Sequence, residues 1–173
     1  MIQNKPKLNI LSIDCDWVLS LKHQEELLGF LIPLLYTHED ITLSLTHRDI
    51  YPLITHGYDE YNLINIDHHH DFRYDDNSKT KLHEGNWLSH LSNIFRNKIN
   101  YTWISNFNSV HVHLNSLQNL KSFYFDHNIN YIKEKKFDKI FICCSPDYAA
   151  VSESIITYKI IERIVNENKK SKP

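Results

Sequence analysis

Residues 65–72 read Asn65-Ile66-Asp67-His68-His69-His70-Asp71-Phe72, in which an apolar strand pattern runs into five consecutive ionisable side chains. Burying that many charged and imidazole groups without compensation would cost several kcal/mol, so bound divalent metal is expected. In an extended chain alternate side chains share a face, which would place Asp67, His69 and Asp71 together. His68 and His70 would then face away from the metal and serve as packing or outer residues.

The apolar pattern of the rest of the chain predicts alternating strands and helices. The predicted strands are short and rich in aliphatic and aromatic residues, and they span 8–13, 41–46, 62–66, 99–105 and 139–144. The predicted helices have apolar residues at spacings of three and four, and they span 24–36, 48–56, 86–97 and 149–168. Nearly continuous apolar strands are typical of sheets covered on both faces, so we predict an α/β three-layer sandwich with a mainly parallel sheet. Residues 106–137 have no clear pattern.

Length and composition predict one domain, residues 1–173, and the cysteines indicate a reducing compartment. Hydrophobic residues make up 42% and charged residues 23%, which is typical of soluble globular proteins. The longest apolar run, 27–36, contains Pro33 and is shorter than the ~20 residues of a membrane span, and no signal core follows the N-terminus. The three cysteines include the adjacent pair Cys143 and Cys144 and suggest no disulfide framework. We therefore expect a cytoplasmic protein with no membrane partner.

The same composition argues against nucleotide and nucleic-acid binding. With three glycines, the chain has no glycine-rich phosphate loop. The net charge is −2 and no basic cluster is longer than Lys169-Lys170, so no nucleic-acid partner is expected. Twelve histidines, several of them near predicted strand ends, favour metal chemistry instead.

Ligands of parallel α/β sheets lie beyond the carboxyl ends of the strands, and this chain repeatedly places polar residues there. Alone, Asp14 and Asp16 also fit a capping role, and His47 fits a helix start or a surface position. Together the polar residues suggest a set of four aspartates and two histidines: Asp14, Asp16, His47, Asp67, His69 and Asp71. Mostly carboxylate donors with some imidazole suit Mn²⁺ better than structural zinc, and a pair of such ions activates water for hydrolysis.

Two motifs carry a family resemblance. Ser12-x-Asp14-x-Asp16 and Asp67-x-His69-x-Asp71 resemble the signature motifs of the arginase and agmatinase ureohydrolases, which combine an α/β fold with two Mn²⁺ ions. The motifs occur here in reversed order and in a shorter chain, as in a circularly permuted version of the arginase/deacetylase-like fold. With Gly85-Asn86-Trp87 and Ser145-Pro146-Asp147-Tyr148, residues 8–155 resemble small arginase-like proteins that include the peptide arginases. That resemblance implies conversion of arginine to ornithine in a ribosomally made precursor peptide, with release of urea.

The resemblance also implies a role for each residue of the metal set. Asp14 and Asp67 would bridge the two ions. His47 and Asp71 would complete the coordination of one ion, and His69 and Asp16 that of the other. Asp71 would in addition hold the hydroxide that attacks the guanidinium carbon.

Substrate binding and proton transfer need further residues. A planar guanidinium prefers a carboxylate partner, for which Asp147 is the first candidate and Glu153 the second, although Asp147 fits equally well as an acidic residue at a helix N-terminus. A histidine suits proton delivery to the departing amine, and we favour His90 over His83. The Gly85-Asn86 segment resembles the one that carries this histidine in arginases, and we include Asn86 among the substrate-binding residues.

Three alternatives stay open at the level of sequence. A ureohydrolase acting on free arginine or another small guanidine would use the same centre. Asp67-His68-His69 also spells the motif of DHH-type Mn²⁺ phosphoesterases, although this chain has no room for their second, glycine-rich basic domain. A metal-binding module with a purely structural site is the non-enzymatic alternative. Ureohydrolases commonly form homo-oligomers, so self-association is a further expectation.

Overall fold

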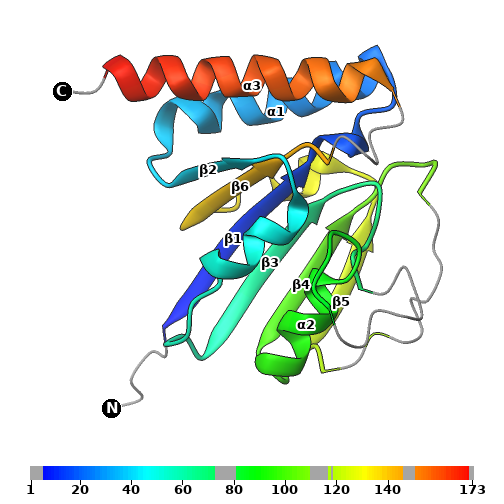
Figure 1. The fold of residues 1–173 in the computed structure, drawn as a ribbon, viewed down its shortest axis with the longest axis vertical. Coiled ribbons are helices and arrows are strands. Elements are labelled where there is room, and N and C mark those ends of the chain that lie inside the picture. The colour runs from blue at the N-terminus through cyan, green and yellow to red at the C-terminus, as the bar shows by residue number, and fades with distance from the viewer. Residues whose placement is uncertain (1–5, 73–80, 110–116, 118, 146–150, 172–173) are drawn as a thin grey trace.

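The computed structural model describes residues 6–72, 81–109, 117, 119–145 and 151–171. Six strands form one sheet in the order β2-β6-β1-β3-β4-β5, and every neighbouring pair is parallel (Figure 1). The strands are β1 (Lys7–Asp14), β2 (Ile41–Ser44), β3 (Glu60–Ile66), β4 (Ile99–Ile104), β5 (Ser122–Asp126) and β6 (Lys139–Cys143). The predicted α/β fold with a parallel sheet is confirmed.

Helices cover both faces of the sheet and complete the three layers. On one face lie α1 (Leu21–Thr37) and α3 (Ser152–Ser171), which contact each other along their length (Figure 1). On the other face lie α2 (Trp87–Ile94) and the 3-10 helix η2 (His47–Leu53). Two further 3-10 helices, η1 (Cys15–Trp17) and η4 (Ile129–Ile132), pack on the α1/α3 side.

Alternation along β1 decides which layer each side chain meets. Leu11 and Ile13 lie in the core formed with α1 and α3, whereas Leu8 and Ile10 lie in the core formed with α2 and η2. Both sets are buried, because each face of the strand is covered by a helical layer. Since alternate residues share a face, Asp14 at the end of β1 is on the side of α2 and η2.

Two elements differ from the sequence-based expectation. Residues 48–56 were predicted as a helix, but the structure has the 3-10 helix η2 there, with Pro52 inside it. Proline lacks a backbone N–H and clashes with the preceding turn, which disfavours a regular α-helix at this position. Strand β5 lies in the stretch 106–137 that had no clear pattern, because none of its five side chains is buried and exposed and partly exposed positions do not alternate regularly.

The other predicted elements are present with shifted ends. α3 begins at Ser152 and continues to Ser171, while positions 149–150 of the predicted helix lie outside the described residues. Among the residues that the structure describes, no helix is long and apolar enough to cross a membrane.

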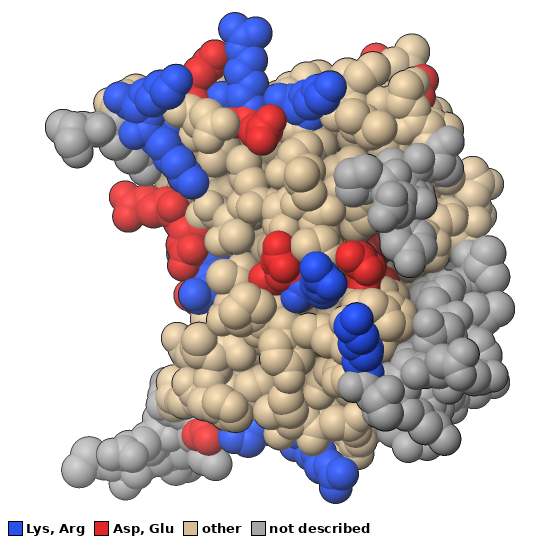
Figure 2. Space-filling model, in the orientation of Figure 1, with Lys and Arg blue, Asp and Glu red and all other residues tan. Residues whose placement is uncertain are grey.

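On the face shown in Figure 2, the visible lysine and arginine side chains are spread over separate places, chiefly near its upper and lower edges.

Candidate metal centre

Polar side chains from four parts of the chain meet at the carboxyl ends of β1, β3 and β6, where they line a pocket of about 400 Å³. The pocket contains all six predicted ligands. They are Asp14, Asp16, His47, Asp67, His69 and Asp71. The other described residues that line it are His83, Glu84, Gly85 and Ser145. The convergence expected from the sequence is therefore present.

The segment after β3 reaches the pocket by a turn. The strand ends at Ile66, and the Asp67 carboxylate accepts a hydrogen bond from the His69 backbone N–H at 2.8 Å. Asp71 has a φ of 54°, a left-handed conformation that aspartate tolerates better than most residues. The expectation of a straight extended segment was wrong, because this turn and the left-handed residue bring the three ligands together.

A first group of donors surrounds the His47 ring. Its Nδ1 lies 2.9 Å from Asp71 Oδ2, 3.1 Å from Asp67 Oδ2 and 3.5 Å from Asp14 Oδ2. The Trp87 indole N–H donates to Asp71 Oδ2 at 2.5 Å, and the Asn65 amide donates to Asp67 Oδ2 at 3.0 Å. These outer contacts fix the directions of the carboxylate oxygens.

A second group lies on the other side of Asp67. His69 Nδ1 is 2.9 Å from Asp16 Oδ2 and 4.0 Å from Asp67 Oδ1. Asp67 therefore presents Oδ2 to the first group and Oδ1 to the second. Asp14 is placed similarly between neighbours, since Oδ2 faces His47 and accepts from the Ser145 hydroxyl at 2.8 Å, while Oδ1 accepts from the Asp16 backbone N–H at 3.2 Å. A carboxylate that serves two groups is the arrangement that two neighbouring cations need.

Contacts on the side of the His47 ring away from the carboxylates hold it in one orientation. Its Nε2 lies 2.7 Å from Ser12 Oγ, and the ring packs against Trp87 at 4.9 Å and stacks on Phe141 at 5.9 Å between centroids. Nδ1 faces three carboxylates, and a metal ion bound there would leave the ring proton on Nε2, which could then donate to the serine oxygen. A ring fixed in this way can offer its Nδ1 lone pair to a metal ion.

We predict that Ser12→Ala weakens metal binding about 10–100-fold, the usual cost of losing an outer hydrogen bond to a ligand histidine. The measurement is calorimetric titration of the metal-free protein with Mn²⁺. Ser152→Ala, at an exposed position on α3, is the matched control and should leave the affinity unchanged. Equal affinities for the two variants would contradict the orienting role of Ser12.

The pocket has an excess of negative charge, which a bound cation would neutralise. All four aspartates and His47 are at most 4% exposed, and no lysine or arginine is among the described residues that line the pocket. Four ionised carboxylates exceed the charge that two imidazolium groups can supply. Buried charge of one sign needs a counter-ion, and oxygen and imidazole donors are suitable metal ligands. These groups can hold a metal ion.

Without metal, the surplus charge appears as shifted pKa values. Burial raises the pKa of Asp67 to about 7, with a further contribution from the Asp71 carboxylate. Burial also raises the pKa of Asp16 well above its usual range. Burial alone would raise the pKa of Asp14 too, but the hydrogen bond and charge of His47 outweigh it and hold this pKa at about 2. Burial opposes protonation of His69, yet its hydrogen bond to Asp16 and the charges of Asp67, Asp16 and Asp71 together raise its pKa to about 9.

Metal binding should release protons at neutral pH. His69, with a pKa of about 9, is protonated in the metal-free protein at pH 7, and Asp67, with a pKa of about 7, is partly protonated. Metal ligands must be deprotonated, so the affinity for Mn²⁺ should increase between pH 6 and pH 8. Titrations in buffers of different ionisation enthalpy measure the released protons directly. An affinity that does not change over this range would contradict the assigned ligands.

The residues predicted for proton transfer are separated by the structure. His83 lines the pocket, and its Nδ1 accepts from the Gly85 backbone N–H at 3.1 Å. His90 was favoured, but it lies in α2 and is not among the described residues that line the pocket. The helix begins at Trp87, so His90 lies almost one turn along it, whereas His83 is in the loop at the pocket. The preference is therefore reversed.

The predicted substrate-binding residues that the structure describes do not line the pocket. Asn86 is fully buried, with its side chain accepting from the His83 backbone N–H and donating to the Lys81 carbonyl, each at 2.9 Å. It shapes the loop and is not among the described lining residues. Glu153 accepts from the Ser152 hydroxyl in the first turn of α3 and is likewise not among them. Asp147 lies outside the described residues.

His68 and His70 have the supporting roles expected of them. The His70 ring is buried and meets Trp103 edge to face at 5.5 Å, and its Nδ1 accepts from the Phe72 backbone N–H. The His68 ring contacts Asn106 at 3.2 Å. Neither is among the described residues that line the pocket.

Glu84 is the lining residue that sequence reasoning missed. Its carboxylate accepts a hydrogen bond from the Thr46 hydroxyl at 2.6 Å, next to His47 in the chain. Burial opposes ionisation of Glu84, but this hydrogen bond, a backbone hydrogen bond and the charges of Arg48 and His83 together lower its pKa. Glu84 adjoins His83 and Gly85, which the sequence did single out, but no local pattern distinguishes it from a surface glutamate.

The chain matches no protein-family model, no curated protein and no solved structure. The function that follows therefore rests on the geometry of this centre and on the motifs of the sequence.

Proposed function

We propose that this protein is a dimanganese hydrolase of the arginase kind, which converts arginine side chains of a precursor peptide into ornithine with release of urea. One observation carries the proposal. Asp67 divides its two carboxylate oxygens between two donor groups, and each group contains one histidine and one further aspartate. Such a division is suited to two ions that share a carboxylate.

The donor chemistry favours Mn²⁺ over structural zinc, because carboxylate oxygens outnumber imidazoles in the two groups. His47 and Asp71 would hold one ion, and His69 and Asp16 the other. Asp14 and Asp67 would be shared. When bound, the ions supply a nucleophilic water at neutral pH and polarise the substrate.

The protein's own residues would bind the guanidinium and move a proton. Glu84 offers an ionised carboxylate within the pocket, and a planar guanidinium is well matched to a carboxylate partner. Asp147 remains the candidate that the sequence motif suggests. His83, in the same pocket, is suited to deliver a proton to the departing ornithine amine.

Substrate docking by Glu84 leads to a specific expectation. Glu84→Gln should reduce urea release at least ~10-fold, mainly through a higher KM, because a neutral amide loses the charge-assisted contact to the guanidinium. Glu162→Gln, at an exposed position of α3, is the matched control. Steady-state assays of urea release measure both. Unchanged kinetics in the Glu84 variant would assign the docking role to another carboxylate.

The test of the function is incubation of the Mn²⁺-loaded protein with an arginine-containing peptide. Each converted arginine consumes one water and releases one urea, so the peptide mass should decrease by one cyanamide unit per arginine. Mass spectrometry measures the decrease, and a colorimetric urea assay measures the other product. Urea from free arginine or agmatine but none from the peptide would favour the small-guanidine alternative.

Two further arms cover the remaining alternatives. Cleavage of a phosphodiester such as bis(p-nitrophenyl) phosphate, with no loss of arginine, would replace the proposal by a phosphoesterase. Tight Mn²⁺ binding with no turnover of guanidines or phosphodiesters would point to a structural metal module.

A further inference from the structure

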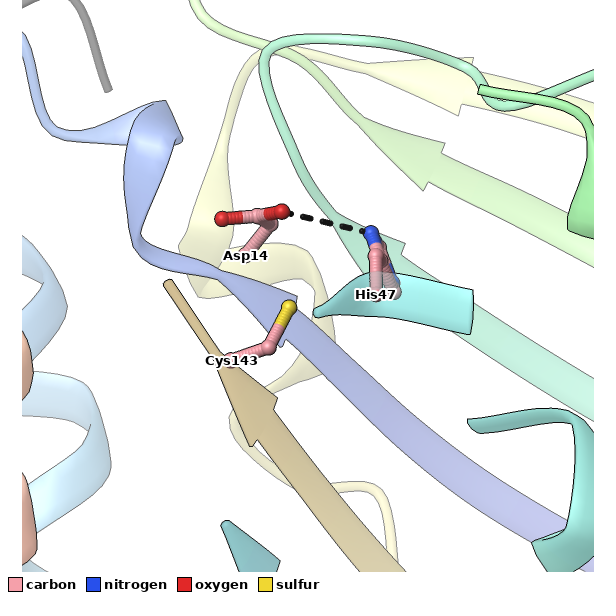
Figure 3. A group of neighbouring side chains, drawn as sticks. All are labelled: Asp14, His47 and Cys143. Carbon is pink, nitrogen blue, oxygen red and sulfur yellow. Dashed lines mark ion pairs between the residues drawn. The ribbon is translucent and has the colours of Figure 1, made fainter. Parts of the chain in front are cut away.

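A third set of donors shares two residues with the centre and adds a thiol next to it, although Cys143 is not among the described residues that line the pocket. It consists of Asp14, His47 and Cys143, whose ligand atoms all lie within 4.8 Å of one another, and all three residues are buried (Figure 3). They come from β1, η2 and β6, and Asp14 and Cys143 are direct partners in the parallel register of β1 and β6. The register of β1 and β6 therefore places two of the three donors opposite each other.

The thiol faces the centre because of its position in β6. Phe141 and Cys143 share the face toward α2 and η2, whereas Ile142 and Cys144 lie in the core on the α1/α3 side. All three cysteines of the chain are free thiols. Cys144 is thus a neighbouring buried thiol with its side chain on the opposite face, which makes it a natural control.

His47 belongs to two competing sets. Its Nδ1 faces Asp67 and Asp71 at 3.1 and 2.9 Å, and it also lies 3.5 Å from Asp14 Oδ2 in the set that contains Cys143. The other ring nitrogen is occupied by Ser12. A single lone pair on Nδ1 can serve one ion at a time, so an ion bound with Cys143 withdraws His47 from the carboxylate set.

We propose that a thiophilic divalent ion of the zinc class binds to Asp14, His47 and Cys143 and competes with the hard ion for the same histidine. Thiolate, imidazole and carboxylate are a normal donor set for Zn²⁺, whereas Mn²⁺ prefers oxygen donors. On binding, the Sγ–H bond of Cys143 breaks, the proton passes to solvent and the sulfur pair coordinates the ion. The inference rests on the proposed function in placing the catalytic ions at this centre, and it adds zinc-class ions as inhibitors.

Co²⁺ is the probe, because a thiolate ligand produces a charge-transfer band in the near ultraviolet that oxygen and nitrogen ligands do not. The wild-type protein and Cys144→Ser should both show this band when loaded with Co²⁺. Cys143→Ser should lose it, and its ratio of Zn²⁺ to Mn²⁺ affinity should decrease at least ~10-fold. Absence of the band in the wild-type protein, or its persistence in Cys143→Ser, would overturn the inference.

A second measurement avoids any variant. X-ray absorption at the zinc edge of the wild-type protein, loaded with one equivalent of Zn²⁺, should reveal a sulfur neighbour at about 2.3 Å. A first shell of oxygen and nitrogen alone would refute the assignment. Neither readout requires turnover, so a protein that shows the sulfur ligand but releases no urea would contradict the proposed function and leave this inference intact.

Discussion

Asp67→Asn should abolish urea release and reduce Mn²⁺ affinity by more than the ~10–100-fold that loss of an outer hydrogen bond costs. Asp67 is the residue whose two carboxylate oxygens face the two donor groups, at 3.1 Å from His47 and 4.0 Å from His69. An asparagine keeps the shape but replaces one oxygen by an NH₂ group that cannot coordinate. One ion loses its ligand from this residue, and the amide oxygen left for the other ion carries no negative charge.

The measurements for this variant are calorimetric titration with Mn²⁺ and the urea assay. Asp59→Asn, at an exposed position before β3, is the matched control and should behave as the wild-type protein. Full activity of the Asp67 variant would overturn the proposed mechanism.

Thermal unfolding separates loss of a ligand from loss of the fold. Burial and the Asp71 carboxylate raise the folded-state pKa of Asp67 to about 7, above its unfolded value of roughly 3.9. Ionised Asp67 therefore opposes folding of the metal-free protein, and this cost grows as the pH increases from about 4 to above 7. At pH 8 without metal, Asp67→Asn should thus have a Tm at least as high as that of the wild-type protein. Mn²⁺ should raise the Tm of the wild-type protein and of Asp59→Asn much more than that of Asp67→Asn, because ligand binding stabilises the state that binds it.

Trp103→Ala should lower the free energy of unfolding by about 3–5 kcal/mol, the usual cost of removing a large buried aromatic side chain. Trp103 is fully buried in β4, meets His70 edge to face and donates its indole N–H to the Asp67 backbone carbonyl at 2.9 Å. The substitution leaves a cavity under the turn that carries the ligands. It also leaves that carbonyl without its donor.

Trp103→Phe separates the two contributions. It retains most of the ring volume and removes the hydrogen bond, so the expected loss is about 1–3 kcal/mol. Urea denaturation with a constant m-value measures both variants. A loss below ~1 kcal/mol for Trp103→Ala would show that the turn after β3 is held by other contacts.

The six candidate metal ligands are the part of the site that the sequence predicted best. All six proposed ligands line one pocket, because each follows a strand or lies at the start of a 3-10 helix at the same edge of a parallel sheet. The local route was different, since the residues after Ile66 form a turn with a left-handed Asp71 and do not continue the strand. Side-chain alternation along a strand suggested Asp67, His69 and Asp71 as ligands, and that reason was wrong. The structure nevertheless brings these three residues together.

The positions of the residues proposed for substrate binding and proton transfer were predicted less well. His83 lines the pocket, whereas the favoured His90 is not among the described lining residues. The Asn86 side chain makes hydrogen bonds within its own loop. Glu84 lines the pocket but was not singled out from the sequence. These residues lie between Lys81 and α2, in a loop whose path depends on contacts such as that of Glu84 with Thr46. No periodic pattern describes such a loop.

The sequence by itself determined the strand and helix alternation, the parallel α/β class and the six candidate ligands. These features follow from local chemistry, because apolar runs report burial and carboxylates and imidazoles cluster where strands end. Only the tertiary structure decided that Asp67 faces both groups, that Glu84 and His83 join the pocket, and that Cys143 meets His47. Those relations join residues far apart in the chain, and they depend on strand register, turn conformation and loop path, none of which a short stretch of sequence encodes.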